Sequence, residues 1–429
     1  MNKSLDLHFF DEATQVTTLN APGNDLSAEM KTYYEKRLLD AAEPELVHDQ
    51  FADKYPIPQG SGKTIEFRKY SALPKSLTAL TEGTTPPGSK LNVSAVTATV
   101  SQYGDWIGMS DMLEMTAIDR NVEQATRLLG ASAGRTLDTI TREVLCGGTF
   151  VDWAGYTENG VYHASNGRED ITSSCVLTPD MVFKAAAELK SQNAKAIDDS
   201  FVAIVHPYVA YDLMRSEEWI DAHKYASPEH LYAGEIGKLA GVRFVETTEA
   251  KIVAPDAICG VLKNRMKLST ALDATGSKDI VPDAAIGASD AAAINAAISG
   301  GTTYKIYVGK TLCTVASVTA GAAGAAKITV TDTVKDKAKG AMICGHGAGA
   351  DGSAVFLTLF LGQNAYGTTE IEGGGLQHIV KQLGSAGTAD ALNQRATVGW
   401  KATKVAERLV ENFMIRIEST STSNPAANN

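Results

Sequence analysis

The 429-residue sequence predicts an α+β protein with an extended arm, a long β loop, one dominant helix, a mixed α/β segment and an inserted β-rich module. Three observations lead to this fold class. Residues 119–146 repeat apolar side chains at helical spacing. Residues 63–106 alternate apolar and polar side chains on both sides of a Pro-Pro-Gly tip, as two strands would. Between 263 and 352 the composition shifts to Ala, Gly, Ser and Thr with short apolar runs, which is typical of a separate module.

Residues 1–62 are predicted to form an N-terminal arm. Apolar residues recur at helical spacing from Leu26 to Ala41 and stop before Pro44, so we expect one helix in an otherwise extended stretch. The first 15 residues hold one lysine, three carboxylates and no apolar run longer than two residues, which argues against a secretory signal. We therefore expect the protein to stay in the compartment where it is made.

Residues 63–106 are predicted to form a long two-stranded loop. Ile65 and Phe67 begin the outgoing strand, and the apolar phase of the returning strand slips by one residue at Ala95 and Val96, as a β-bulge would cause. Two strands alone are marginally stable, because no third strand or helix nearby in the sequence covers their apolar face. Another copy of the chain is therefore a candidate to cover it.

The helix predicted at 119–146 is the strongest element of the sequence. Asp119 stands where it can cap the first turn, and Gly147 with Gly148 follows the last turn. At 1.5 Å per residue such a helix is roughly 40 Å long. Its single apolar stripe indicates a core helix whose other face is free for a neighbour.

The remaining chain reads as a mixed α/β domain and a set of late strands. Thr178-Pro179-Asp180 opens a helix, and apolar runs predict strands at 201–205 and 242–246. Alternating residues near 398–402 and 413–417 predict two further strands. Residues 419–429 are polar and are expected to be a flexible tail.

Composition excludes several classes of protein. A formal charge of −11 argues against a protein whose affinity depends on neutralising phosphates. The longest apolar runs fall far short of the roughly 20 residues that cross a bilayer. Five cysteines at wide spacings form neither a disulfide framework nor a metal knuckle, and eight histidines include no close ligand pair. We therefore expect no metal and no cofactor.

The sequence also lacks a convincing catalytic motif. Gly60-Ser61-Gly62-Lys63-Thr64 is similar to a phosphate-binding loop, but Ile57 stands where that motif needs glycine and a strand follows. Paired carboxylates at Asp198-Asp199 and Glu217-Glu218 are more simply solvated faces than acid/base dyads. No catalytic residue is assigned, although dispersed side chains could still converge in the fold.

Three consecutive glycines, Gly373, Gly374 and Gly375, have two readings. They form either a tight reversal or a hinge that absorbs backbone change during a domain rotation. We favour the plain turn, because glycine supplies positive φ wherever a turn needs it.

Several further motifs stand in a fixed order along the chain. They are Leu80-Thr81-Glu82-Gly83-x-x-Pro86, Val96-x-Ala98-Thr99-Val100-Ser101-Gln102-Tyr103-Gly104-Asp105, Ser110-Asp111-x-Leu113-Glu114, Gly234-Glu235-Ile236-Gly237, Ala365-Tyr366-Gly367 and Asn393-Gln394-Arg395-x-Thr397-Val398-Gly399-Trp400. In residues, order and spacing they resemble a known family, the major capsid proteins of tailed bacteriophages related to the podophage N-four. The resemblance covers roughly 60–262 and 354–418 and fades between.

The resemblance implies the Hong Kong phage coat fold, also called the Johnson fold. Its parts would be an N-terminal arm, an extended loop that lies across the adjacent subunit, a peripheral domain with a spine helix, and an axial domain. In this sequence they would occupy 1–62 for the arm, 63–106 for the extended loop, 107–149 and 371–418 for the peripheral domain with its spine helix at 119–146, 150–262 and 353–370 for the axial domain, 263–352 for the inserted module, and 419–429 for the tail.

The resemblance also implies function. The chain would be a structural coat protein, not an enzyme, that self-assembles in the host bacterial cytoplasm into the icosahedral head of a virion and encloses double-stranded DNA. Expected partners are further copies in hexamers and pentamers, portal and scaffolding proteins, a decoration protein on the insert, and non-specifically contacted DNA, with no membrane. The candidate subunit-interface residues are Leu80, Glu82, Pro86, Pro87, Val96 and Val100.

Two alternatives stay open. The same fold would suit the shell of a cargo-enclosing bacterial nanocompartment, and a soluble α/β enzyme would be a protein of another class. For the insert at 263–352, binding of a host glycan or an accessory protein competes with the simpler role of a spacer that adds bulk. We favour the spacer.

Overall fold

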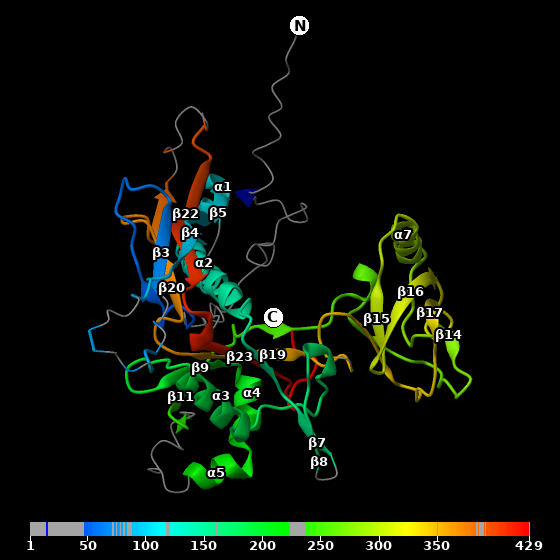
Figure 1. Ribbon diagram of the computed structural model, residues 1–429. Coiled ribbons are helices and arrows are strands. Elements are labelled where there is room, and N and C mark those ends of the chain that lie inside the picture. The colour runs from blue at the N-terminus through cyan, green and yellow to red at the C-terminus, as the bar shows by residue number, and fades with distance from the viewer. Residues whose placement is uncertain are drawn as a thin grey trace. The chain divides into compact units, whose positions relative to one another are not determined.

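The computed structural model divides into two compact units, which we describe separately (Figure 1). Unit 1 is Met1–Val144 with Tyr366–Leu409, and unit 2 is Leu145–Ala365 with Val410–Asn429. The arm helix expected between Leu26 and Ala41 lies outside the described residues. The described residues are 14–15, 47–70, 73, 75–77, 79, 82–83, 88–116, 121–158, 161–223, 237–349, 351–382, 385, 390 and 392–428.

Unit 1 contains a six-stranded sheet and a two-stranded ribbon. The sheet has the order β1-β5-β22-β20-β2, and β21 also pairs with β22. The ribbon pairs β3 with β4 in an antiparallel ladder. The strands are β1 (Thr14–Gln15), β2 (Asp53–Lys54), β3 (Thr64–Tyr70), β4 (Val93–Thr99), β5 (Ser101–Ser110), β20 (Tyr366–Thr369), β21 (Gln377–Lys381) and β22 (Arg395–Arg408).

The core of unit 1 lies between this sheet and helix α2 (Asn121–Cys146), which the sequence predicted as a spine at 119–146. Alternate residues of β22 point to one face of the sheet, and Val398 and Trp400 are buried there with Leu129 and Ala133 of α2. With 26 residues the helix is about 39 Å long. The short helix α1 (Asp111–Thr116) follows β5 directly.

Unit 2 is built on a seven-stranded mixed sheet covered by helices. The central strand β19 (Val355–Leu361) is buried along its whole length and pairs antiparallel with β9 and β23. The other elements are β6 (Val151–Trp153), β9 (Phe201–Val205), β10 (Lys238–Leu239), β11 (Val242–Glu246), β12 (Ile252–Val253), β23 (Met414–Ser419), the hairpin β7 (Tyr156–Glu158) and β8 (Val161–His163), and the helices α3 (Pro179–Ser191), α4 (Pro207–Met214) and α5 (Glu217–His223).

Within unit 2, the segment expected as a β-rich insert forms a six-stranded antiparallel sheet with its own buried core. Helix α7 (Ala288–Ser299), which the sequence analysis did not predict, packs against β16 (Figure 1). Ile294 of α7 is fully buried in this core. The sheet order is β13 (Arg265–Lys267), β18 (Met342–Gly345), β15 (Lys305–Val308), β16 (Thr311–Thr319), β17 (Lys327–Val334) and β14 (Ser277–Ile280).

The peripheral-domain boundary at 418 requires a correction. Strand β23 belongs to unit 2, where it pairs antiparallel with β19 and parallel with β6. Ile415 and Ile417 are fully buried in that sheet. An alternating strand pattern shows that a strand has a buried face but does not show which sheet it joins, so the sequence placed β23 in the wrong domain.

The flexible tail expected at 419–429 is also wrong for the described residues 419–428. Thr420 and Ser421 are fully buried. The amide of Thr420 donates to the carbonyl of Cys175 at 2.9 Å, and Asp212 of α4 accepts from the Ser421 hydroxyl at 2.7 Å and the Thr422 amide at 2.8 Å. A polar sequence is buried here because its hydroxyls and backbone groups find partners inside unit 2.

We predict that Asp212→Ala loosens this C-terminal segment. The variant removes the acceptor for three donors, which costs about 1–3 kcal/mol of unfolding free energy. Amide hydrogen exchange of residues 420–427 should then be faster. The exposed Asp199→Ala serves as the matched control, and equal exchange in both variants would contradict the prediction.

A second prediction concerns pH. His206 precedes Pro207 at the start of α4, and its Nδ1 accepts from the amide of Tyr208 at 3.2 Å. Burial against Phe356 lowers the pKa of His206 from 6.5 to about 4. The unfolded chain therefore binds a proton between pH 6.5 and 4 that the folded chain does not, so the unfolding free energy falls as the pH falls through this window.

Urea unfolding of the wild type and of His206→Asn at pH 4.5 and 7.5 checks this. Asparagine keeps an acceptor for the Tyr208 amide but does not titrate. The loss of stability at low pH, at most about 3 kcal/mol from this one group, should shrink in the variant. An identical pH dependence in the two proteins would show that His206 does not contribute.

Candidate functional site

The ribbon of β3 and β4 presents apolar side chains on both of its faces. The register is regular from Thr64 opposite Thr99 to Tyr70 opposite Val93, with no shift. The predicted β-bulge at Ala95 and Val96 is therefore wrong. The strand is regular, so residues alternate between its two faces throughout. The apolar residues before the slip lie on one face and those after it lie on the other, and no backbone displacement is needed.

One face of the ribbon is partly covered by unit 1 itself. Phe67 lies opposite Val96, and both are half-buried. The ring of Tyr55 packs edge-on against Phe67 with 5.3 Å between ring centroids. Ala98 and Val100, further along, are buried.

On the other face, and in the chain just beyond the ribbon, several described apolar residues are exposed. The Val93 side chain is 50% exposed, Leu91 69% and Leu77 88%. A leucine exposed to this degree gains nothing from its own chain. We refer to Leu77, Leu91 and Val93 as the exposed apolar set of the loop.

The residues predicted for a subunit interface fall in different places. Glu82 is exposed, Val96 is half-buried towards Phe67, and Val100 is only 7% exposed, so it is already packed within its own chain. Leu80, Pro86 and Pro87 lie outside the described residues. The exposed apolar set was not among the predicted interface residues, although the first apolar phase of the returning strand, Leu91 and Val93, was a signal for two of its three members.

A second surface lies on the face of the unit 1 sheet that turns away from α2. Trp106 of β5 is 54% exposed, and the register places it beside Gly399 of β22, which in turn lies beside the half-exposed Ile379 of β21. They line a groove of about 640 Å³. A Cβ at Gly399 would lie 2.9 Å from Cβ of Trp106, so glycine is needed for this close approach.

Gly373, Gly374 and Gly375 form a tight turn within unit 1. Gly373 has φ of +78°, the Gly374 amide donates to the Ile371 carbonyl at 2.7 Å, and the amide and hydroxyl of Thr403 each donate to the Gly374 carbonyl at 2.8 Å. A Cβ at Gly374 would lie 2.6 Å from the Thr403 hydroxyl oxygen. The chain passes between the units at 144–145, 365–366 and 409–410 instead, so the hinge reading of these glycines stays a prediction.

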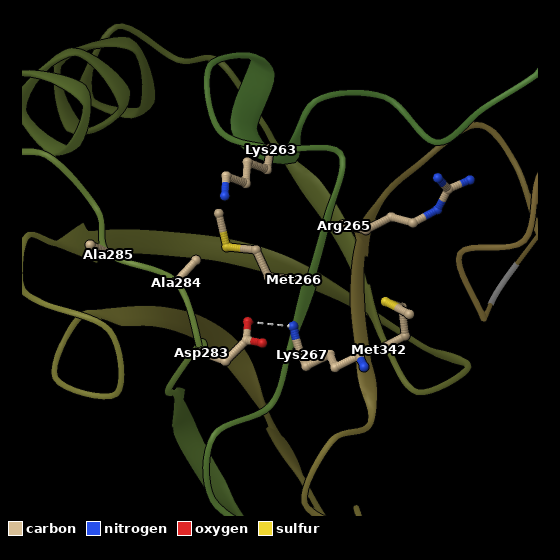
Figure 2. Close-up of a pocket in the computed structure, with 8 residues that line it drawn as sticks. All are labelled: Lys263, Arg265, Met266, Lys267, Asp283, Ala284, Ala285 and Met342. Carbon is tan, nitrogen blue, oxygen red and sulfur yellow. Dashed lines mark hydrogen bonds between the residues drawn. The ribbon is translucent and has the colours of Figure 1, made fainter. Parts of the chain in front are cut away.

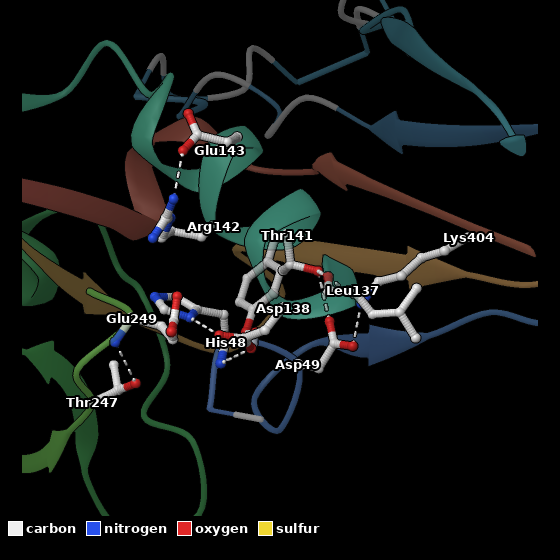
Figure 3. A network of polar contacts seen from close by, with 11 residues as sticks. His48, Asp49, Leu137, Asp138, Thr141, Arg142, Glu143, Thr247, Glu249 and Lys404 are labelled. Carbon is white, nitrogen blue, oxygen red and sulfur yellow. Dashed lines mark hydrogen bonds and ion pairs between the residues drawn. The ribbon is translucent and has the colours of Figure 1, made fainter. Parts of the chain in front are cut away.

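A buried polar network anchors the chain that leads into the loop (Figure 3). His48 and Asp138 of α2 are 0% and 1% exposed, and they bond twice, from the His48 amide at 2.8 Å and through Nδ1 at 2.6 Å. Next to them Asp49 accepts from the Thr141 hydroxyl at 2.6 Å and pairs with Lys404 of β22. Segment 48–49 is thereby fixed to both the spine helix and the sheet.

The same network extends to β20. The hydroxyl of Tyr366 donates to the His48 carbonyl at 2.5 Å, and burial raises the pKa of this hydroxyl well above its usual value. A histidine paired with a carboxylate is also the arrangement of a general base, but here both side chains are closed to solvent. No substrate atom can reach them, so the pair is structural.

The cavities of the insert hold no convincing chemistry either. One cavity of about 470 Å³ is lined by Lys263, Arg265, Lys267 and Asp283, among others. In it the Asp283 carboxylate accepts a hydrogen bond from the Lys267 amide (Figure 2). Another, of about 530 Å³, includes Cys259 and His346, but burial raises the pKa of the Cys259 thiol to about 11, which keeps it protonated and unreactive.

Two further classes of site were sought in the described part of the chain. No cluster of three His, Cys, Asp or Glu side chains there is placed to hold a metal ion. None of its helices combines the length and hydrophobicity that a membrane span requires. The exposed apolar set of the loop and the groove beside Trp106 form the candidate site.

No protein-family model and no curated protein matches the sequence. Solved structures do match over nearly the whole chain, each at 12% identity. The capsid of cyanophage Pam1 gives a TM-score of 0.54 and covers 92% of this chain and 97% of its own. For the capsid of cyanophage P-SCSP1u the TM-score is 0.53, and the match covers 94% of this chain and 95% of the other. For the mature capsid of bacteriophage PhiM1 the TM-score is 0.50, and the match covers 95% of this chain and 96% of the other.

The fold is that of phage capsid proteins. The α+β coat fold implied by the sequence resemblance is thus confirmed, including an extended β loop and a spine helix. At 12% identity the likeness extends to the fold and no further.

We predict that Asp138→Ala destabilises unit 1 strongly. The variant leaves the buried amide and Nδ1 of His48 without their partner, and an unsatisfied buried hydrogen-bonding group costs about 1–3 kcal/mol of unfolding free energy. Urea unfolding measures the loss. The control is Asp105→Ala, whose exposed carboxylate accepts only from the neighbouring Trp106 amide. Equal stability of the two variants would show that the anchor contributes nothing.

Proposed function

We propose that this chain is the major capsid protein of a tailed bacteriophage, and more narrowly of the N-four-like podophages whose motifs it resembles. Many copies would assemble into the icosahedral head that encloses the double-stranded DNA genome. The observation that carries the proposal is the ribbon of β3 and β4, with its exposed apolar set, in a chain that shares its fold with phage capsids over at least 92% of its length.

The proposal gives the exposed apolar set a physical role. Burying apolar surface contributes roughly 25 cal/mol per Å², so covering Leu77, Leu91 and Val93 with an adjacent copy stabilises the assembly and not the single chain. The loop of each copy would lie across the next, which is a heterologous contact. Such contacts close into rings or shells only when the rotation between copies is correct, so function resides in geometry.

The groove beside Trp106 and the base of the loop belong to the same unit, so one copy carries both an exposed apolar loop and an apolar receiving surface. We propose the sheet face around Trp106 and Ile379 as part of the intersubunit contact. Interfaces of obligate size, roughly 2,000–5,000 Å² and shared among several neighbours, would hold the shell together.

The net charge of −11 is consistent with a wall that contacts DNA without gripping it. We propose that the protein assembles in the host cytoplasm and resides in the virion. Portal and scaffolding proteins are the expected partners of a head of this kind. The nanocompartment alternative differs in its contents, because such a shell would enclose a cargo enzyme in place of DNA.

Two loop variants test the proposal. Deleting 78–92 removes the end of the loop, and Leu91→Ser with Val93→Ser removes exposed apolar groups without touching the core of unit 1. The double substitution should change the unfolding free energy by no more than about 0.5 kcal/mol, because both side chains are exposed. Both variants should fail to form shells in negative-stain micrographs and sedimentation.

The control for the point variant is Leu312→Ser, which removes a similarly exposed leucine from the insert and should assemble normally. Normal shells from the loop variants would remove the bridging role. A wild-type chain that stays a monomer at every concentration would remove the capsid proposal itself.

A further inference from the structure

The insert carries charge of the opposite sign to the rest of the chain. Residues 263–352 contain ten Lys and Arg against seven Asp and Glu, a net charge of +3. The whole chain has −11, so the remaining residues carry −14. This segregation was not used by the fold or by the proposed function.

The lysines of the insert gather at one end of its sheet. Lys267 ends β13 and lies opposite Met342 at the start of β18. The carbonyl of Met342 accepts from the amide of Gly309 at 2.8 Å, beside Lys310 in the turn from β15 to β16. A Cβ at Gly309 would lie 3.3 Å from Cδ of Lys337, so the loop from β17 to β18 is adjacent. We refer to Lys267, Lys310, Lys335, Lys337 and Lys339 as the lysine end.

Three carboxylates, Asp273, Asp283 and Asp336, lie at or beside the lysine end and offset only part of the charge of its five lysines. The carboxylate of Asp273 accepts from the amides of Thr275 and Gly276 at 3.0 Å each, and hydrogen bonds from this turn lower its pKa. The ion pair of Lys327 with Asp279 lies at the other end of β17, which runs from 327 to 334. Among the described residues, none of the five lysines forms an ion pair.

The chemistry of the lysine end favours a broad acidic surface over a shaped ligand. Lysine presents a compact point charge on a flexible stem and does not fix a planar or bidentate partner. The cavity that reaches Lys267 is also lined by Lys263, Arg265 and Asp283, but the Arg265 guanidinium already donates to the carbonyls of Gly352, Pro425 and Ala426, and Asp283 adds a negative charge that disfavours a small anion. All of the lysine end except Lys337 is exposed, so it is accessible to a large partner.

We propose that the lysine end binds the acidic surface of a second copy of this chain. This inference rests on the proposed function, because a shell brings many copies into contact, and each neighbour offers a body of charge −14 outside its own insert. A single exposed ion pair contributes little, but complementary charge fixes which surfaces meet and how fast they do so. The insert then acts as an electrostatic clasp between copies and not only as a spacer.

Zero-length carbodiimide crosslinking tests the contact directly. Shells are assembled from an equal mixture of unlabelled and ¹⁵N-labelled full-length chains, crosslinked, digested and analysed by mass spectrometry. We expect mixed-isotope crosslinks between the loop 335–339 and carboxylates of another copy. Their yield should fall at least about threefold when the salt rises from 0.1 to 1 M, because the Debye length shortens from about 10 to 3 Å.

Matched variants connect the crosslinks to charge. Lys335→Gln, Lys337→Gln and Lys339→Gln together should lower the salt concentration at which shells dissociate. The control, Lys190→Gln, Lys195→Gln and Lys327→Gln, removes the same charge from exposed sites elsewhere and should leave that concentration unchanged.

The outcomes separate this inference from the proposed function. Shells that form normally but show only same-copy crosslinks, or none, from 335–339 overturn the clasp and leave the capsid proposal intact. Shells whose lysine end retains soluble polyphosphate but gives no crosslinks between copies also overturn it, in favour of an anionic polymer. Failure of the wild type to form any shell removes the proposed function first.

Discussion

The structure depends on a constraint of β-sheet geometry, that side chains alternate between two faces and each apolar face needs a cover. The ribbon of β3 and β4 has a regular register and apolar groups on both faces, and in the described part of unit 1 a ring contact covers one of them, through Tyr55 against Phe67. Val93 on the other face is 50% exposed. The proposed function assigns the burial of such residues to other copies of the chain.

Such a ribbon is useful only if its base is rigid, and the surrounding packing supplies that rigidity. The outgoing strand begins soon after the segment that His48 and Asp49 fix to α2 and β22. The returning strand leads within two residues into β5, whose ten paired positions with β22 form the longest ladder of unit 1. The hydrogen bonds that His48 and Asp49 make with Asp138 and Thr141 favour one arrangement over its alternatives, while His48 Nε2 has no hydrogen-bond partner in the described part of the chain. The loop is thus held at both ends while its apolar residues stay available.

Sequence reasoning recovered the elements whose signals are local and periodic. Helix α2, strands β9 and β11, and the two-stranded loop follow from spacing alone. The errors concern partners, which spacing does not encode. The alternating residues of β23 predict a strand but do not tell which sheet it joins. Ser421 lies in a polar segment that resembles a flexible tail, yet it is buried. The phase slip at Val96 fits a β-bulge as well as a regular strand with apolar residues on both faces. Helix α7 was missed because its alanines gave little amphipathic contrast within an Ala- and Gly-rich segment.

The interface candidates show the same limit from another side. Val96 and Val100 came from the loop motifs that carry the family resemblance, but a single chain already buries Val100 and half-buries Val96. A contact residue is one that is exposed in the single chain and buried in the assembly. To find it, one must know the strand register, which decides the face on which each side chain lies. The insert is the converse case. The insert has its own hydrophobic core, whose buried residues run from Ile258 to Ile343. Its surface residues are therefore not needed for that core, and they carry a net positive charge in an acidic protein. Exposed apolar residues in the loop and positive charge segregated in the insert are therefore the two features of one sequence from which contacts between copies are proposed.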